Sequence, residues 1–135
     1  MSKNFSWPVR VYFEDTDVGG VVYYANYLRY LERARTEWLR AMGFDQGRLM
    51  QETGLGFAVR NIQADYLKPA RLDDALEVVS RVASHGRVQV VFDQRIMRGG
   101  EELLTASVRI ACMHLARGKP AAMPQDIYEQ FERLT

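Results

Sequence analysis

The sequence predicts a single α+β domain, residues 1–135, in which one long helix lies across a mostly antiparallel sheet of about five strands. Two observations carry this prediction. Apolar residues recur at helical spacing over residues 26–42, whereas the two-residue alternation of strands returns in four segments after residue 57. One helix combined with consecutive strands is typical of the α+β class, and a chain of this length can bury one core.

The first strand is predicted over residues 8–14. Val9, Val11 and Phe13 fall on one face of this segment, and Pro8 stands where the strand begins. The alternation therefore predicts that these three apolar side chains face the core together.

A short acidic loop joins this strand to the helix. In its EDTD sequence, residues 14–17, the carboxylates of Asp15 and Asp17 lie on one side if the chain stays extended. Gly19 and Gly20 follow, and glycine permits a tight turn and the close approach of backbone to a ligand. The loop thus places Asp17 a few residues ahead of a helix start.

The long helix predicted over residues 26–42 has a signal at each end. Asn26 suits the N-cap position, and Gly43 suits the residue that follows a helix. The apolar stripe that we expect to face the sheet consists of Tyr27, Leu28, Leu31, Ala34, Trp38, Leu39 and Met42.

The remaining pattern predicts a short helix, four strands in a consecutive meander and a terminal helix. In chain order these elements lie at residues 46–52, 57–66, 76–82, 88–96, 104–114 and 125–134. The second strand changes parity, so a bulge is expected near Arg60 and Asn61. Gly99 and Gly100 indicate a hairpin. Such a sheet has exposed edges, so we expect self-association through an edge strand.

The bulk composition excludes several classes of function. A net charge of +1 gives no electrostatic footprint for nucleic acid or an anionic membrane. No apolar run approaches the ~20 residues that span a bilayer, and the first residues lack the apolar stretch of a signal peptide. The single cysteine, Cys112, excludes an internal disulfide and fits a reducing compartment. We therefore expect a cytoplasmic protein without a transmembrane segment.

Few side chains fit a known type of reactive site. His85 and His114, the only histidines, lack the spacing of metal ligands, so no metal is expected. Cys112 alternates with core residues, which favours a buried, inert thiol over a nucleophile. The sequence contains no phosphate-binding loop, dinucleotide fingerprint or G-x-S-x-G elbow, and no cofactor is expected.

The strongest catalytic candidate is Asp17, because it precedes the start of the long helix. Free N–H groups at a helix N-terminus bind developing negative charge, so a carboxylate and an oxyanion site can meet around one substrate group. A solvated or helix-capping carboxylate is the alternative. Of the tyrosines at the same helix start, we expect at least two to pack there and one to line a substrate pocket. This cluster consists of Tyr23, Tyr24, Tyr27 and Tyr30.

The opening stretch EDTDVGGVVYYANYLRYLERARTEWLR, residues 14–40, resembles the signature of the 4-hydroxybenzoyl-CoA thioesterase family. The likeness covers nearly the whole chain, from WPVRVYFEDTD through YLKPARLDD to QRI. That family has the hotdog fold, in which an antiparallel sheet wraps around one long helix and chains pair edge to edge. The sequence is most similar to the branch encoded beside the Tol–Pal envelope system of Gram-negative bacteria. The resemblance implies hydrolysis of an acyl-CoA thioester.

The resemblance also implies roles for individual residues. The family's catalytic aspartate falls on Asp17, and its carbonyl-polarising backbone N–H falls on Tyr24. Neighbouring candidates for substrate contact are Gly20, Tyr23 and Asn26. Active sites of this fold lie between subunits, so contacts to coenzyme A come from both chains. Our candidates for its phosphates are Lys68, Arg87 and Lys119.

The chain departs from this branch at two positions. Many relatives carry a histidine where this chain has Tyr24, and a tyrosine where it has Phe13. Any residue supplies a backbone N–H, so the role assigned to the Tyr24 backbone survives the change, whereas an imidazole role does not. The departure therefore bears on mechanism and acyl preference more than on the class of reaction.

Three functions follow, and the first is favoured. It is an acyl-CoA thioesterase, a homodimer or homotetramer, in which Asp17 acts as nucleophile or as general base on water. The second is a non-catalytic module that binds acyl-CoA or acyl carrier protein. The third is a hotdog dehydratase, which is disfavoured because neither His85 nor His114 lies in the opening stretch. The sequence leaves open the acyl group and whether its carrier is coenzyme A or acyl carrier protein.

Overall fold

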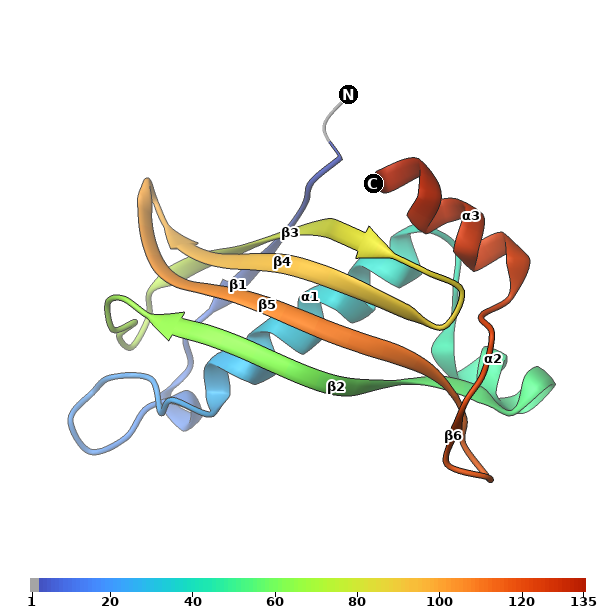
Figure 1. The fold of residues 1–135 in the computed structure, drawn as a ribbon. Helices are drawn as coiled ribbons and strands as arrows, with labels where there is room; N and C mark the ends of the chain where they lie inside the picture. Colours follow the sequence, from blue (N-terminus) through green and yellow to red (C-terminus); the bar gives the residue numbers. More distant parts are fainter. Residues whose placement is uncertain (1–2) are drawn as a thin grey trace.

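A curled antiparallel sheet lies against one long helix in the computed structural model, which describes residues 3–135 (Figure 1). The strands are β1 (Phe5–Arg10), β2 (Leu55–Tyr66), β3 (Ala75–His85), β4 (Gln89–Arg98), β5 (Glu101–His114) and the two-residue β6 (Lys119–Pro120). Their spatial order is β1-β3-β4-β5-β2, and β6 pairs with β5. All pairings are antiparallel. The architecture agrees with the α+β class predicted from the pattern.

The long helix α1 (Asn26–Ala41) confirms the predicted one and crosses the concave face of the sheet (Figure 1). The residue after its C-cap is Gly43, whose φ of 94° is the left-handed conformation expected there. The N-cap prediction is wrong: the N-cap is Ala25, and Asn26 is the first helical residue. The buried side chains of α1 are Tyr27, Tyr30, Leu31, Ala34, Arg35, Trp38 and Leu39.

Two shorter helices flank the sheet. α2 (Gln46–Thr53) begins after Asp45, whose Oδ1 accepts hydrogen bonds from the N–H groups of Gly47 (2.9 Å) and Arg48 (3.2 Å). It ends at Gly54, which adopts a φ of 73°. α3 (Gln125–Leu134) packs against β3 and lies at the far end of the molecule in Figure 1. Both helices were predicted. Within the described residues, no helix is long and apolar enough to cross a membrane.

The strand order corrects the predicted meander. β3, β4 and β5 follow one another in the sheet, but β2 pairs with β5 at the opposite edge instead of with β3. The segment 67–74 makes this possible, because it crosses the end of the sheet from β2 to β3. Alternation shows which side chains share a face, but it does not tell which strand lies beside which.

Local features of the later strands were predicted correctly. The register of β2 against β5 shifts between Val59 and Asn61, which is the expected bulge. Gly99 and Gly100 form the turn of the β4–β5 hairpin, and Gly99 has a φ of 61°. β3 continues to His85, three residues beyond its predicted end at residue 82.

The first strand differs most from its prediction. β1 spans residues 5–10, and Pro8 lies inside it at the edge of the sheet, where its missing N–H costs no ladder bond. Pairing with β3 ends at Arg10, opposite Ala75. Phe13–Asp15 then form a short 3₁₀ turn, so Val9 and Val11 are buried as expected while Phe13 is 81% exposed.

Candidate active site

The loop that follows the 3₁₀ turn is a tight hairpin. Thr16 and Val22 form an antiparallel bridge across its base. The Asp17 N–H donates to the Val21 carbonyl (2.9 Å), and the Gly20 N–H donates to the Asp17 carbonyl (3.0 Å). Gly20 has a φ of 76°, a left-handed conformation that glycine adopts without strain. The predicted Gly-Gly turn is therefore present and holds the backbone on both sides of Asp17.

The Asp17 carboxylate is exposed but anchored by one oxygen. Oδ1 accepts a hydrogen bond from the Gly19 N–H at 2.9 Å. A Cβ on residue 19 would lie 3.3 Å from this oxygen, so glycine allows the close approach. Oδ2 accepts no hydrogen bond from the described residues. An oriented carboxylate with a free oxygen is suited to act as a base or a nucleophile.

The start of α1 presents a backbone donor without an acceptor. Tyr24 lies two residues before the helix, and its N–H donates no hydrogen bond within residues 3–135. Its carbonyl, which belongs to the next peptide group, accepts a hydrogen bond from the Tyr66 hydroxyl (3.2 Å). The Asn26 N–H donates to the Tyr23 carbonyl at 2.8 Å, and this carbonyl shares a peptide group with the Tyr24 N–H, so the bond holds that N–H in place. A fixed, unpaired N–H at the positive end of a helix is a site for an oxyanion.

The tyrosine cluster divides into two pairs. Tyr27 and Tyr30 are buried, and their rings meet edge to face at 6.3 Å. Tyr23 and Tyr24 are exposed, the latter by 64%, and their ring centroids are 4.7 Å apart. The prediction that at least two of the four pack at the helix start is confirmed, and the exposed pair stays a prediction for the substrate pocket.

Asp15 links the acidic loop to the helix start, a role that the sequence pattern did not reveal. Asp15 is buried, whereas Asp17 is exposed. The two carboxylates would lie on one side only in an extended segment, and residues 13–15 form a 3₁₀ turn instead. The Oδ2 of Asp15 accepts from the Tyr12 N–H (2.9 Å). Its carbonyl accepts from the Tyr23 N–H (3.0 Å) and from Asn26 Nδ2 (2.9 Å). Asn26 thus orients the loop with its side chain instead of capping the helix.

A buried hydroxyl lies near the Asp15 carboxylate. Tyr30 Oη has no hydrogen-bond partner within the described part of the chain. Burial raises the pKa of Tyr30 strongly, and the nearby negative charge of Asp15 raises it further. The phenol therefore stays neutral and does not compete as a base with Asp17.

The segment 69–74 is hydrogen-bonded to the loop that carries Asp17. The Val22 N–H donates to the Ala70 carbonyl at 2.9 Å, and the Leu72 N–H to the Gly20 carbonyl at 3.4 Å. The Ala70 N–H in turn donates to the Tyr27 hydroxyl at 2.9 Å. One short segment therefore contacts both the loop with Asp17 and the first turn of α1.

Arg98 clamps this segment to the β4–β5 hairpin. Its guanidinium donates to the Pro69 carbonyl (3.1 Å), to Asp74 Oδ2 (2.7 Å) and to Glu101 Oε1 (2.6 Å). Burial opposes ionisation of Asp74, but hydrogen bonds from the Arg71 N–H and from Arg98 outweigh it and lower the pKa of this carboxyl. Arg98 therefore contacts the loop that carries Asp17 only indirectly, through the segment 69–74.

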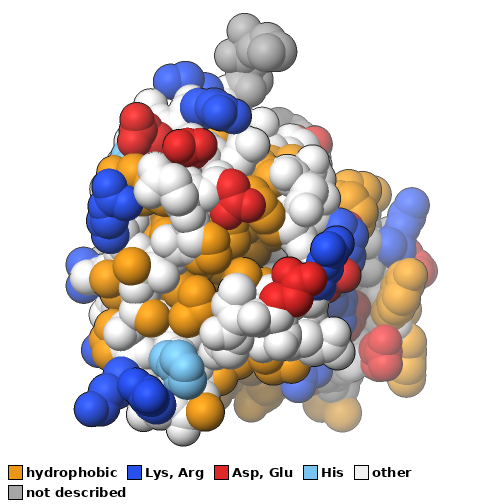
Figure 2. All heavy atoms as spheres, turned by 90° about the vertical axis from the view of Figure 1, so that its right-hand side faces the viewer, with side chains coloured by type: hydrophobic (Ala, Val, Ile, Leu, Met, Phe, Trp, Pro, Cys, Tyr) orange, Lys and Arg blue, Asp and Glu red, His pale blue; other side chains and the backbone are white. Residues whose placement is uncertain are grey.

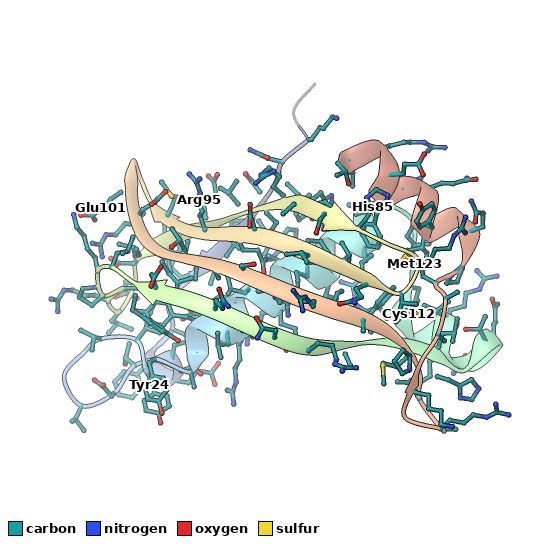
Figure 3. The ribbon with its side chains drawn as sticks, viewed as in Figure 1. Tyr24, His85, Arg95, Glu101, Cys112 and Met123 are labelled. Atoms are coloured by element: carbon teal, nitrogen blue, oxygen red, sulfur yellow. The ribbon has the colours of Figure 1, made fainter. Side chains whose placement is uncertain are left out.

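The predicted site residues gather only in part. Asp17, Gly20, Tyr23, Tyr24 and Asn26 lie at one end of the sheet. Figure 3 shows both Tyr24 and Glu101 at that end. The Glu101 carboxylate forms an ion pair with Lys68 Nζ at 2.8 Å. The site thus has one of the three candidate phosphate contacts nearby.

The other two phosphate candidates lie at the opposite end of the sheet. Arg87 donates to Gln125 Oε1 (2.9 Å) and lies 4.6 Å from the centroid of the Tyr128 ring, both on α3. Lys119 is exposed on β6. Figure 3 places His85 and Met123 beside α3 at this end, far from Tyr24. One chain therefore does not bring Arg87 and Lys119 to the Tyr24 site.

Histidine and cysteine lie away from the candidate site. His85 Nδ1 is 3.0 Å from Thr135 Oγ1, and its ring packs on Tyr128. The Nδ1 of His114 is buried and has no hydrogen-bond partner among the described residues. Cys112 is buried as predicted, and burial raises the pKa of its thiol. Within residues 3–135, no three metal-ligating side chains lie together.

Comparisons with known proteins agree on one family. Residues 11–131 match the family model described as the thioesterase-like superfamily. The chain is 45% identical over 134 residues to the acyl-CoA thioesterase YbgC of Haemophilus influenzae, covering 99% of this chain and 98% of that protein. It is 46% identical over 130 residues to the acyl-CoA thioester hydrolase YbgC of Escherichia coli, covering 96% of each.

Solved structures extend the agreement to the fold. A crystal structure described as a probable thioesterase from Bartonella henselae matches with a TM-score of 0.86 at 35% identity, over 90% of this chain and 99% of that one. The long α1 inside a curled antiparallel sheet is the hotdog arrangement that the resemblance implied. Since the family model spans most of its residues and full-length relatives approach half identity, the chain belongs to the thioesterase-like superfamily.

Proposed function

We propose that this protein is an acyl-CoA thioesterase whose reaction is centred on Asp17 and the Tyr24 N–H. The observation that carries the proposal is the pairing of an oriented carboxylate that has one free oxygen with an unpaired N–H at a helix start. Asp15 joins the two through the backbone and the Asn26 side chain. The names of the two YbgC relatives support the same substrate class.

The reaction needs an attacking oxygen, a site for the oxyanion and a thiolate that leaves. Either Asp17 attacks the thioester carbon directly and water then hydrolyses the mixed anhydride, or Asp17 takes the proton of the attacking water. The carbonyl oxygen becomes negative in either case and accepts a hydrogen bond from the Tyr24 N–H. The C–S bond then breaks, and the thiolate of coenzyme A departs and is protonated. One N–H of this kind accounts for roughly 2.7–4 kcal/mol of barrier stabilisation.

The active assembly in this proposal contains at least two chains. β2 has a free edge, because among the strands of residues 3–135 it pairs only with β5. Its Val59 side chain is 48% exposed. A long, exposed edge strand is a template for pairing with a second copy. Arg87 and Lys119 of a second chain are then the candidates for the phosphates that one chain does not reach. A homodimer or homotetramer and a cytoplasmic location stay predictions.

The decisive test is release of free thiol from a panel of short, long and aromatic acyl-CoAs. We expect Asp17→Asn to keep the fold and to lower kcat by about a hundredfold or more, because the amide is neither base nor nucleophile. Glu14→Gln, at an exposed carboxylate three residues earlier, is the matched control and is expected to keep wild-type turnover. Near wild-type turnover by Asp17→Asn would remove Asp17 from the mechanism.

Isotope labelling tests whether Asp17 acts as the nucleophile or as the general base. In a single turnover in H₂¹⁸O, attack by Asp17 followed by hydrolysis at its own carbonyl leaves ¹⁸O in the protein. General-base catalysis puts the label only in the acid product. Label in the peptide that contains residue 17 therefore establishes the anhydride route, whereas label in the acid product alone fits both general-base catalysis and attack of water at the acyl carbon of the anhydride.

A second candidate function is a non-catalytic module that binds acyl-CoA or acyl carrier protein. It is favoured by the exposed tyrosine ring at position 24, where many relatives have histidine. It predicts saturable binding of acyl-CoA without thiol release, and appreciable turnover on any member of the panel eliminates it.

A further inference from the structure

A buried tyrosine in the first turn of α1 accepts a hydrogen bond from a segment outside the helix. Tyr27 is the second residue of α1 and is 4% exposed. Its hydroxyl accepts from the Ala70 N–H at 2.9 Å, across 43 positions of sequence. Ala70 is fully buried, so solvent does not reach its N–H to replace a lost acceptor. The ring fills the core with or without this bond, which gives the hydroxyl a role separate from packing.

Ala70 connects this hydroxyl to the hairpin loop of the candidate site. Its carbonyl accepts from the Val22 N–H at 2.9 Å. Val22 also bridges Thr16 across the base of the hairpin, and Val21 forms an antiparallel bridge with Arg71. Residues 70–72 therefore lie along the returning side of the hairpin as a third extended segment. A hydrogen-bonded path thus runs from the first turn of α1 through Ala70 into the hairpin.

The ring of the same tyrosine contacts the other half of the candidate site. The rings of Tyr27 and Tyr66 meet edge to face, with their centroids 5.4 Å apart. The Tyr66 hydroxyl donates to the Tyr24 carbonyl at 3.2 Å, and Tyr24 lies three residues before Tyr27. One side chain therefore adjoins the support of the hairpin with its hydroxyl and the support of the helix start with its ring.

The loop is held to the rest of the chain on both sides of Asp17. Asn26 Nδ2 holds it two residues before Asp17, at the Asp15 carbonyl, whereas Ala70 holds it five residues after, at Val22. Anchors on both sides leave the carboxylate little freedom to move relative to the helix start. A displacement of about 1 Å in a reacting group can cost about a hundredfold in rate. The second anchor therefore bears on the reaction proposed above.

We propose that Tyr27 is a positioning residue for thioester hydrolysis, and that its hydroxyl fixes the Asp17 carboxylate relative to the Tyr24 N–H through Ala70. The inference rests on the proposed function, because it takes these two groups to act on one thioester. Without the hydroxyl, the Ala70 N–H loses its acceptor, residues 70–72 shift, and the hairpin moves with them. The effect falls on the chemical step and leaves substrate affinity nearly unchanged, because the buried hydroxyl acts through Ala70.

Steady-state kinetics of Tyr27→Phe test the hydroxyl while the ring stays in place. With the acyl-CoA that the wild type hydrolyses best, we expect kcat to fall about tenfold or more and KM to stay within about twofold. Ser80→Ala is the matched control, since its fully buried hydroxyl also accepts an N–H bond, from Gln94 Nε2 at 2.9 Å. Both variants are expected to lower Tm, but only Tyr27→Phe lowers kcat at equal folded fraction. Equal kcat values for the two variants overturn the inference.

The Asp17→Asn background shows whether the hydroxyl acts through the carboxylate. If Tyr27 positions Asp17, the further fall in kcat on Tyr27→Phe is expected to shrink to less than about twofold once the carboxylate is an amide. An equally large fall in both backgrounds means that the hydroxyl acts on another group, and it overturns the inference. A raised KM with an unchanged kcat in Tyr27→Phe also overturns it, because that is the effect of losing a substrate contact.

Amide hydrogen exchange separates this inference from the proposed function, because it needs no turnover. In Tyr27→Phe, protection of the Val22 and Asp17 N–H groups is expected to fall about tenfold or more, while that of Leu39, far along α1, stays unchanged. Unchanged protection in the hairpin overturns the inference even if kcat falls. If Asp17→Asn keeps full turnover, the proposed function fails, and the exchange result alone then decides whether Tyr27 holds the hairpin.

Discussion

The two ends of the sheet are built by different means. At the end that carries Asp17, backbone hydrogen bonds and buried polar groups hold the chain, and large side chains such as Phe13 and Tyr24 face outward. At the other end, α3 packs the buried Phe131 against Phe92 of β4 with their ring centroids 6.0 Å apart. Figure 2 shows hydrophobic side chains gathered at the centre of this end. One end is held by polar contacts and the other by burial.

The difference indicates which end is completed by something outside the chain. At the α3 end the buried rings already contact one another within the chain, so their packing needs no outside partner. The loop end leaves an N–H without an acceptor and aromatic rings in solvent, which are groups that a substrate or a second chain covers. Substitutions at the α3 end are therefore expected to change stability, and those at the loop end to change activity.

The largest effect is expected at the α3 end. Phe131→Ala removes a fully buried ring and is expected to lower the free energy of unfolding by about 3–5 kcal/mol, because a cavity is left in the core. Urea unfolding measures this loss. The kcat of the molecules that remain folded is expected to stay within twofold of wild type, and a large fall in their kcat would contradict the division between the ends.

Asp15 tests the loop end through its buried carboxylate. Asp15→Ala leaves the Tyr12 N–H without an acceptor and is expected to cost about 1–3 kcal/mol of stability together with a fall in kcat/KM. Asp15→Asn keeps an acceptor oxygen and is expected to recover most of both. Steady-state kinetics of the pair, compared at equal folded fraction, measure the effect. Equal activity of the two variants would mean that the turn does not position Asp17.

Arg98 tests the clamp on the supporting segment. Arg98→Gln breaks contacts to Pro69, Asp74 and Glu101, so we expect kcat to fall about tenfold with KM nearly unchanged. Arg95→Gln is the matched control, since Arg95 is on the same strand and pairs with Glu102, away from the loop. Lys at position 98 is expected to restore only part of the activity, because it lacks the fork that reaches several acceptors. Identical kinetics for both glutamine variants would remove Arg98 from the site.

The smallest effect is the pH dependence from Asp74. Its pKa is lower in the folded chain than in the unfolded chain, so its ion pair stabilises the fold above the ordinary pKa of aspartate and loses this effect as pH falls through the lowered value. The carboxyl is mostly solvent-screened, and the contribution is less than about 1 kcal/mol. Urea unfolding of wild type and Asp74→Asn from pH 6 to pH 3 is expected to show a difference that shrinks with acidity. A constant difference would contradict the ion pair as its cause.

The sequence by itself determined the elements and the position of the loop. Periodicity was sufficient for α1, because a stripe such as Leu31, Ala34 and Trp38 has one structural solution over that length. Parity also located the β2 bulge between Val59 and Asn61. Both are local properties of the chain. The resemblance of the opening stretch to a known family then supplied the candidate roles of Asp17 and Tyr24.

Only the tertiary structure decided which residues meet. Alternation predicted Phe13 in the core, and it placed Asp15 and Asp17 on one side if the segment stayed extended. The chain instead turns at residue 13, after its pairing with β3 has ended at Arg10, and Asp15 is buried. The placement of β2 beside β5, and hence the segment that supports the loop, depends on a crossover that no local pattern encodes. The same holds for Arg35, which the predicted stripe did not include: it is buried, and its hydrogen bond to Gln94 depends on the strand that the sheet brings opposite it.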